Sequence, residues 1–178
     1  MYMNVAKGSL RLYSAKLPED AKNLWQAPNV LLQKLPADEF TATTKLTFTP
    51  NTKLENEKAG LAIMGMSYAN LAIKSAKDGN YLVYSTCKDA EKGKPETEQV
   101  VTKLTSPVLY LRVKVTSGAK CNFSYSTDGT NFTSTGDTFV AEPGKWIGAK
   151  VGLFCTRTSQ INDSGYADFD WFRITPNN

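Results

Sequence analysis

Apolar and polar residues alternate along much of this chain, which is the pattern of half-buried β-strands. In residues 41–49, alanine, leucine and phenylalanine share one side of the chain, while the other side is polar. The same alternation occurs in three further segments: 109–115, 121–126 and 149–155. One apolar side per strand is typical of antiparallel sheets that cover a single core. No segment has a sustained apolar period of 3.6 residues, so we expect an all-β protein.

Turn-forming residues separate these segments. Asp128-Gly129 lies between two alternating runs, and Asp78-Gly79-Asn80 lies between two more. A short Asp-Gly turn between apolar runs predicts a β-hairpin. The charged, Pro-containing stretch 88–98 is expected to be an exposed loop. Many short strands with closely spaced turns indicate a two-sheet antiparallel sandwich.

The length of 178 residues and the 41% hydrophobic content are sufficient for one domain with a sizeable core. With neither an internal repeat nor a linker, we expect one sandwich domain over 8–175, with tails at 1–7 and 176–178. The chain contains no apolar run near the ~20 residues of a membrane helix, so no membrane partner is expected. Its first residues lack the pattern of a signal peptide.

Charge and cysteine content exclude several classes of site. The net charge is +4, but lysine and arginine are spread along the chain instead of forming a basic stripe, so no nucleic-acid partner is expected. The three cysteines show no C-x-x-C spacing and histidine is absent, which argues against zinc. Each cysteine lies in an apolar stretch, as a small core residue does. The sequence leaves open whether two of the three cysteines form a disulfide.

The residues offer little for catalysis. Without histidine, a Ser–His or Cys–His nucleophile cannot form. Glycoside hydrolysis needs two carboxylates that flank the scissile bond, and the best candidates are Asp168 and Asp170. Two apart on a regular strand, they would share a side; they could form a carboxylate pair, coordinate calcium, or hold loops by hydrogen bonds. Because both acids lie on one strand, without an opposing partner, a structural or calcium role is favoured over catalysis.

Aromatic residues carry the stronger functional signal. Flat side chains beside polar partners suit the apolar C–H faces of sugar rings. Most large aromatics of a sandwich belong to its core, but Tyr68 and Trp146 lie at expected loop–strand junctions, where binding residues concentrate. We therefore predict that Tyr68 and Trp146 bind carbohydrate, with Gln33, Asn70 and Arg112 as hydroxyl partners.

Five blocks of the sequence resemble the domain that follows the catalytic propeller of family 43 glycoside hydrolases, the β-xylosidases and α-L-arabinofuranosidases. They occur in the order of that family and extend from about residue 8 to 174: LWQAPNVLLQK at 24–34, AGLAIMGMSY at 59–68, FSYSTDG at 123–129, WIGAKVGLF at 146–154 and GYADFDWF at 165–172. The resemblance thus covers nearly the whole chain.

This resemblance implies a concanavalin A-like jelly-roll sandwich that is not catalytic. In that family the domain packs against the propeller, helps to close the active-site pocket, and in some members binds xylan. Related sandwiches often carry a structural calcium near the final strand, which would give Asp168 or Asp170 a role; no other cofactor is implied. The propeller with its catalytic acids is not part of this chain, and a secreted or periplasmic parent enzyme is favoured.

Two functions follow as expectations. The first is an accessory domain that binds or positions xylan-type chains. The alternative is a structural domain that docks on the propeller through an apolar rim of Met64, Met66 and Tyr68 and shapes its pocket without binding sugar itself. An independent enzyme is not expected.

Overall fold

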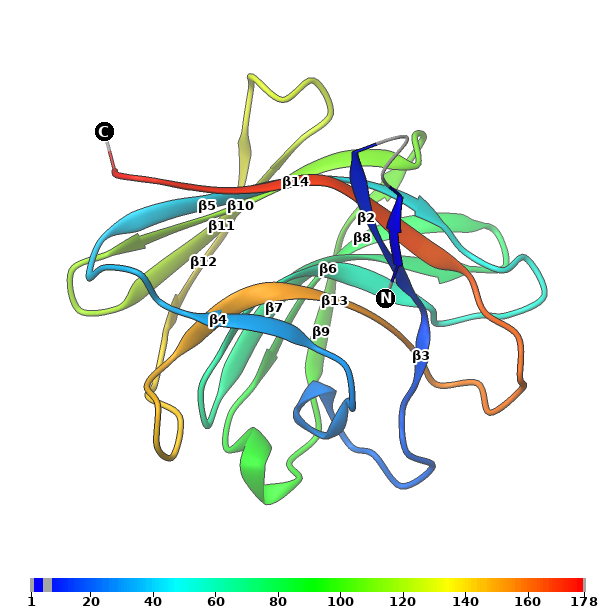
Figure 1. The fold of residues 1–178 in the computed structure, drawn as a ribbon, viewed down its shortest axis with the longest axis horizontal. Helices are drawn as coiled ribbons and strands as arrows, with labels where there is room; N and C mark the ends of the chain where they lie inside the picture. Colours follow the sequence, from blue (N-terminus) through cyan, green and yellow to red (C-terminus); the bar gives the residue numbers. More distant parts are fainter. Residues whose placement is uncertain (1, 5–7, 178) are drawn as a thin grey trace.

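The computed structural model describes residues 2–4 and 8–177, which form two β-sheets packed face to face (Figure 1). Across sheet A the strands are, in order, β1 (Tyr2–Asn4), β2 (Ser9–Tyr13), β14 (Tyr166–Thr175), β5 (Phe40–Thr49), β10 (Val108–Thr116), β11 (Lys120–Ser126) and β12 (Thr133–Val140). Across sheet B they are β3 (Ala15–Lys16), β13 (Lys150–Arg157), β6 (Lys58–Met64), β7 (Tyr68–Ala76), β8 (Gly79–Cys87) and β9 (Thr97–Leu104), with β4 (Leu31–Lys34) also paired to β13. Two 3-10 turns, η1 (Leu24–Gln26) and η2 (Ala90–Lys92), are the only helical elements of the described residues. The all-β, two-sheet prediction is confirmed; among the described strands only the short β3–β13 pair is parallel.

The predicted strands and hairpins are present. The four alternating segments lie in β5, β10, β11 and β13, and the two Asp-Gly turns connect β7 with β8 and β11 with β12. Gly79 and Gly129 have φ angles of 134° and 79°, which glycine adopts at little cost. The Asp128 carboxylate accepts the backbone N–H groups of Thr130 and Asn131 at 2.7 and 2.8 Å. These bonds lower the pKa of Asp128 and hold the turn together.

The main core lies between the sheets. In β5 and β10 buried and half-buried residues alternate strictly over most of the strand, so each strand turns one side toward sheet B. Large fully buried members of this core include Phe40, Phe48, Phe123 and Phe169. Burial of one such side chain stabilises the fold by about 1.5–3 kcal/mol.

Sheet B, unlike sheet A, is covered on both sides. Its outer side carries a second apolar cluster in which Leu24 of η1 packs with Tyr68, Val83 and Phe154 of the strands. The segment 17–30 and η2 lie over this side (Figure 1). Strands β6, β7 and β13 are therefore buried almost throughout. The expectation of a single core face is wrong for sheet B, because a distant part of the chain covers the second face.

The two ends of the described chain are attached to sheet A. Residues 2–4, expected in a tail, form β1, and the Asn177 side chain bonds Thr41 and the carbonyl of Val115. Residues 1, 5–7 and 178 of the expected tails lie outside the described residues.

The three cysteines are free and buried, as expected for core residues, and burial raises the pKa of Cys121 to about 12. None of the helical elements in the described part of the chain could cross a membrane.

Candidate functional site

The predicted carbohydrate-binding residues do not form one site. Tyr68 and Asn70 lie on the covered outer side of sheet B, and neither has exposed surface. Trp146 is 88% exposed in the loop before β13, and Gln33 is exposed on β4. Arg112 lies on the outer side of sheet A. The structure therefore assembles only Tyr68 and Asn70 and separates the other residues.

Tyr68 cannot provide the stacking surface for which it was selected. Its hydroxyl accepts the backbone N–H of Leu24 at 2.9 Å and donates to Glu96 Oε2 at 2.7 Å. The Asn70 amide donates to the same Glu96 oxygen at 3.2 Å. Burial, followed by the neighbouring Glu96 carboxylate, raises the pKa of Tyr68. The tyrosine lies at a loop–strand junction as predicted, but the segment that carries Leu24 covers it.

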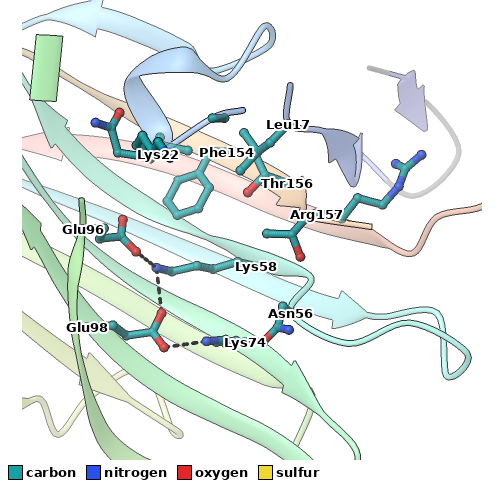
Figure 2. Close-up of a pocket in the computed structure, with 14 residues that line it drawn as sticks. Leu17, Lys22, Asn56, Lys58, Lys74, Glu96, Glu98, Phe154, Thr156 and Arg157 are labelled. Atoms are coloured by element: carbon teal, nitrogen blue, oxygen red, sulfur yellow. Dashed lines mark hydrogen bonds and ion pairs between the residues drawn. The ribbon is translucent and has the colours of Figure 1, made fainter. Parts of the chain in front are cut away.

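Leu24 and Glu96 also line a pocket on the outer side of sheet B, between the covering segment and the strands (Figure 2). Six of its lining residues define what we call the Lys58 pocket: Leu17, Leu24, Lys58, Lys74, Glu96 and Glu98. Its volume is about 210 Å³, below the roughly 300–1,000 Å³ of pockets that enclose drug-sized ligands. The Asn23 amide anchors the covering segment by bonds to the carbonyls of Ala90 and Lys94 at 3.0 and 2.7 Å.

Lysine and glutamate alternate across the floor of the Lys58 pocket. Lys58 Nζ lies 2.6 Å from Glu96 Oε1, 3.1 Å from Glu98 Oε2 and 2.7 Å from Ser85 Oγ, which uses all three of its protons. Lys74 Nζ lies 2.6 Å from Glu98 Oε1. Burial opposes ionisation of Glu98, but the two lysines outweigh it and lower its pKa. The two lysines and two glutamates of the floor therefore balance in charge, and Lys22 and Arg157 add positive charge to the rest of the lining.

The Lys58 pocket retains unused hydrogen-bonding capacity. Each Glu98 oxygen accepts one protein hydrogen bond and has a second lone pair. Lys74 Nζ makes one bond to protein and has two further protons. Leu17 and Phe154 (Figure 2), together with Leu24, supply the apolar part of the lining. A donor and an acceptor thus lie side by side near an apolar wall.

Sequence reasoning missed these charged residues. Glu96 and Glu98 were assigned to an exposed loop, whereas Glu98 lies on β9. One signal was available: Lys58 and Lys74 are the single charged residues of two mostly apolar strands. A charge on a strand that is buried on both sides needs a partner.

The two aspartates predicted near a metal have separate partners. Asp168 receives Arg11 Nε and Nη2 at 2.7 Å each, and Asp170 lies 2.6 Å from Lys45 Nζ. A β-bulge at Asp170 interrupts the regular strand that was expected to place both on one side. Among the described residues, no three acidic or cysteine side chains gather as metal ligands. These two residues act as ion-pair partners in this structure.

Large apolar side chains are exposed at one end of sheet B. We call Trp25, Trp146 and Ile147 the apolar end. The glycines that flank Trp146 and Ile147, Gly144 and Gly148, line a shallow hollow together with Trp25. The docking rim predicted from sequence is wrong for Met64 and Tyr68, which are buried; the apolar end exposes other residues instead.

Comparison with known proteins identifies the family. Residues 1–175 match the model of the β-xylosidase C-terminal concanavalin A-like domain. A β-xylosidase of Formosa agariphila is 30% identical over 152 residues, which are 84% of this chain and 24% of that protein. The bifunctional GH43-CE protein of Bacteroides eggerthii has a TM-score of 0.81 at 25% identity, over 99% of this chain and 22% of that one.

The xylan β-1,4-xylosidase of Bacillus halodurans shares the fold, with a TM-score of 0.71 at 18% identity over 93% of this chain and 32% of its own. This chain thus spans about a fifth to a third of the lengths of these relatives. The concanavalin A-like sandwich predicted from the sequence blocks is confirmed, and the chain belongs to the family of concanavalin A-like C-terminal domains of β-xylosidases, in glycoside hydrolase family 43.

Proposed function

We propose that this domain binds a sugar residue of a xylan-type chain in the Lys58 pocket, as a non-catalytic accessory to the catalytic domain of its parent enzyme. The adjacent free donor and acceptor, on Lys74 and Glu98, are the observation that carries the proposal. A sugar hydroxyl both donates and accepts, so two neighbouring hydroxyls can satisfy the pair. Across the floor the two lysines balance the two glutamates, and the apolar wall suits the C–H face of the ring.

Calorimetric titration of the isolated chain with xylo-oligosaccharides and arabino-oligosaccharides tests this function. Glu98→Gln and Lys74→Met should each weaken binding at least tenfold, because a hydrogen bond to a charged group contributes about 1.5–3 kcal/mol. Lys103→Met is the matched control: Lys103 lies on the same strand as Glu98 but pairs with Asp78 outside the pocket. A chelator added to a parallel titration tests the expected calcium.

Two results would contradict the proposal. One is the absence of heat with every sugar, from protein whose circular dichroism shows a folded sandwich. The other is an affinity that Glu98→Gln and Lys74→Met leave unchanged. In the second case sugar binds elsewhere on the domain, and Trp146 is the next residue to substitute.

Docking on the catalytic domain is a second candidate, favoured by the exposure of the apolar end. Trp146 is almost fully exposed and Ile147 nearly half exposed, while Lys150 is the one charged residue in the lining of the adjacent hollow. Few polar groups are available there for sugar hydroxyls, so a protein surface is the better match. In the full-length parent enzyme, Trp146→Ser should separate the unfolding of this domain from that of the catalytic domain in a calorimetric scan. A scan identical to that of the unmodified enzyme would exclude this role for Trp146.

A further inference from the structure

The outer face of sheet A, turned away from sheet B in Figure 1, carries arginines stacked on aromatic rings. The Arg112 guanidinium lies 3.4 Å from the centre of the Phe132 ring, and that of Arg173 lies 4.5 Å from the Trp171 ring. Arg11 stacks on Tyr166 in the same way, but it is neutralised by Asp168. No ion pair involves Arg112 or Arg173 among the described residues. This face therefore has positive charge that the fold leaves uncompensated.

The strand register places these two arginines in one row. Thr43 of β5 pairs with Arg112 of β10 on one side and with Arg173 of β14 on the other. Neighbouring strands lie about 4.8 Å apart, so the two backbone positions are about 10 Å apart. The adjacent row holds Tyr110 and Trp171, whose rings are 6.1 Å apart, on either side of Lys45. Two cationic side chains and two aromatic rings thus occupy a compact area.

Arg112 is held in place before any ligand arrives. Its Nε donates to Thr43 Oγ1 at 3.1 Å, and Phe132 lies against its plane. Burial lowers the pKa of Arg112, but a guanidinium stays charged at neutral pH. Its two Nη groups donate to no described residue. A guanidinium fork with free Nη groups binds a carboxylate through two parallel hydrogen bonds.

We propose that the outer face of sheet A binds the carboxylates of an acidic polysaccharide, such as uronic acid side groups of a xylan, through Arg112 and Arg173. Charge complementarity selects an anionic chain, and the half-buried rings of Tyr110 and Trp171 offer contacts for sugar C–H groups beside the guanidiniums. The proposal rests on a polysaccharide-degrading parent enzyme, but not on the Lys58 pocket, which faces the opposite side of the sandwich. Arg112 and Arg173, which are about sixty positions apart in the sequence, are brought together here by strand pairing.

Affinity electrophoresis of the chain in gels that contain uronate-bearing xylan tests the proposal. Carboxyl-reduced xylan of the same backbone is the neutral control. We expect retardation by the acidic xylan, at least tenfold weaker retardation by the reduced one, and a similar loss in Arg112→Gln and in Arg173→Gln. Arg173 is exposed, so its substitution tests binding even where Arg112→Gln perturbs folding. Lys103→Gln on sheet B should bind as the unmodified chain does.

The outcomes separate the two sites. Loss of acidic-xylan binding in the arginine variants, with Glu98→Gln unaffected, supports this face independently of the Lys58 pocket. Absence of retardation, equal retardation by reduced xylan, or indifference to both arginine substitutions would overturn it. Equally strong retardation by single-stranded DNA that is lost in the same variants would also overturn it, because the face would then recognise negative charge without regard to sugar.

Discussion

Replacing Lys58 by methionine should destabilise the domain markedly, because the substitution removes the central cation of the pocket floor and retains most of the side-chain volume. The Lys58 side chain is only 11% exposed and contacts Glu96, Glu98 and Ser85. Without it, both carboxylates lose a partner, but Glu96 and Glu98 are partly exposed, so water screens part of the loss.

The magnitude follows from the partners that remain. Removing one member of a fully buried ion pair costs about 3–5 kcal/mol. Glu96 still accepts hydrogen bonds from Tyr68 and Asn70, and Glu98 keeps Lys74. We therefore expect a loss of about 2–3 kcal/mol in the free energy of unfolding. For a domain of this size that corresponds to a decrease in Tm of roughly 4–12 °C.

Urea denaturation followed by circular dichroism, with a calorimetric scan, measures this effect. Lys77→Met is the matched control, because Lys77 is 84% exposed and lies 3.5 Å from Glu55; its loss should stay below about 0.5–1 kcal/mol. Adding Glu96→Gln to Lys58→Met should recover part of the stability, since it removes one unpaired carboxylate. If Lys58→Met costs no more than the control, the network does not contribute to stability as argued.

Three further predictions concern the fold. In Gly152→Ala the new Cβ would collide with the carbonyl oxygen of Leu31. This should weaken the pairing of β4 with β13, so hydrogen exchange of the backbone amides of Leu31–Lys34 should accelerate. Unchanged exchange rates would show that β4 accommodates the methyl group without loss of pairing. The three buried thiols should react slowly with Ellman's reagent at pH 8 and all at once in urea; fewer than three in urea would reveal a disulfide. With no histidine and with lowered pKa values at Glu98 and Asp128, the free energy of unfolding should be nearly constant between about pH 5 and 8. It should fall below about pH 4, where the unfolded chain takes up protons before the folded one; a decline already near pH 6 would contradict this.

The strands, both hairpins and the two-sheet architecture could be predicted from the sequence because they depend on local rules. Alternation with a period of two assigns each residue to a side of its strand, and Asp-Gly turns limit how neighbouring strands connect. The five sequence blocks, which occur in the order of the family, indicated that this sandwich is concanavalin A-like. The bulge at Asp170 could not be predicted in this way, because it depends on pairing with β5.

The alternation of apolar and polar residues does not show which part of the chain covers each side of a strand. Only the tertiary structure determines that covering. Tyr68 has the sequence context of an exposed binding residue, but a segment more than forty positions away lies over it. The charged residues of the Lys58 pocket come from β6, β7 and the β9 region, and Arg112 and Arg173 on the outer face of sheet A come from β10 and β14. Charge that is evenly spread along the chain becomes concentrated in space, because strand pairing brings together residues that are distant in sequence.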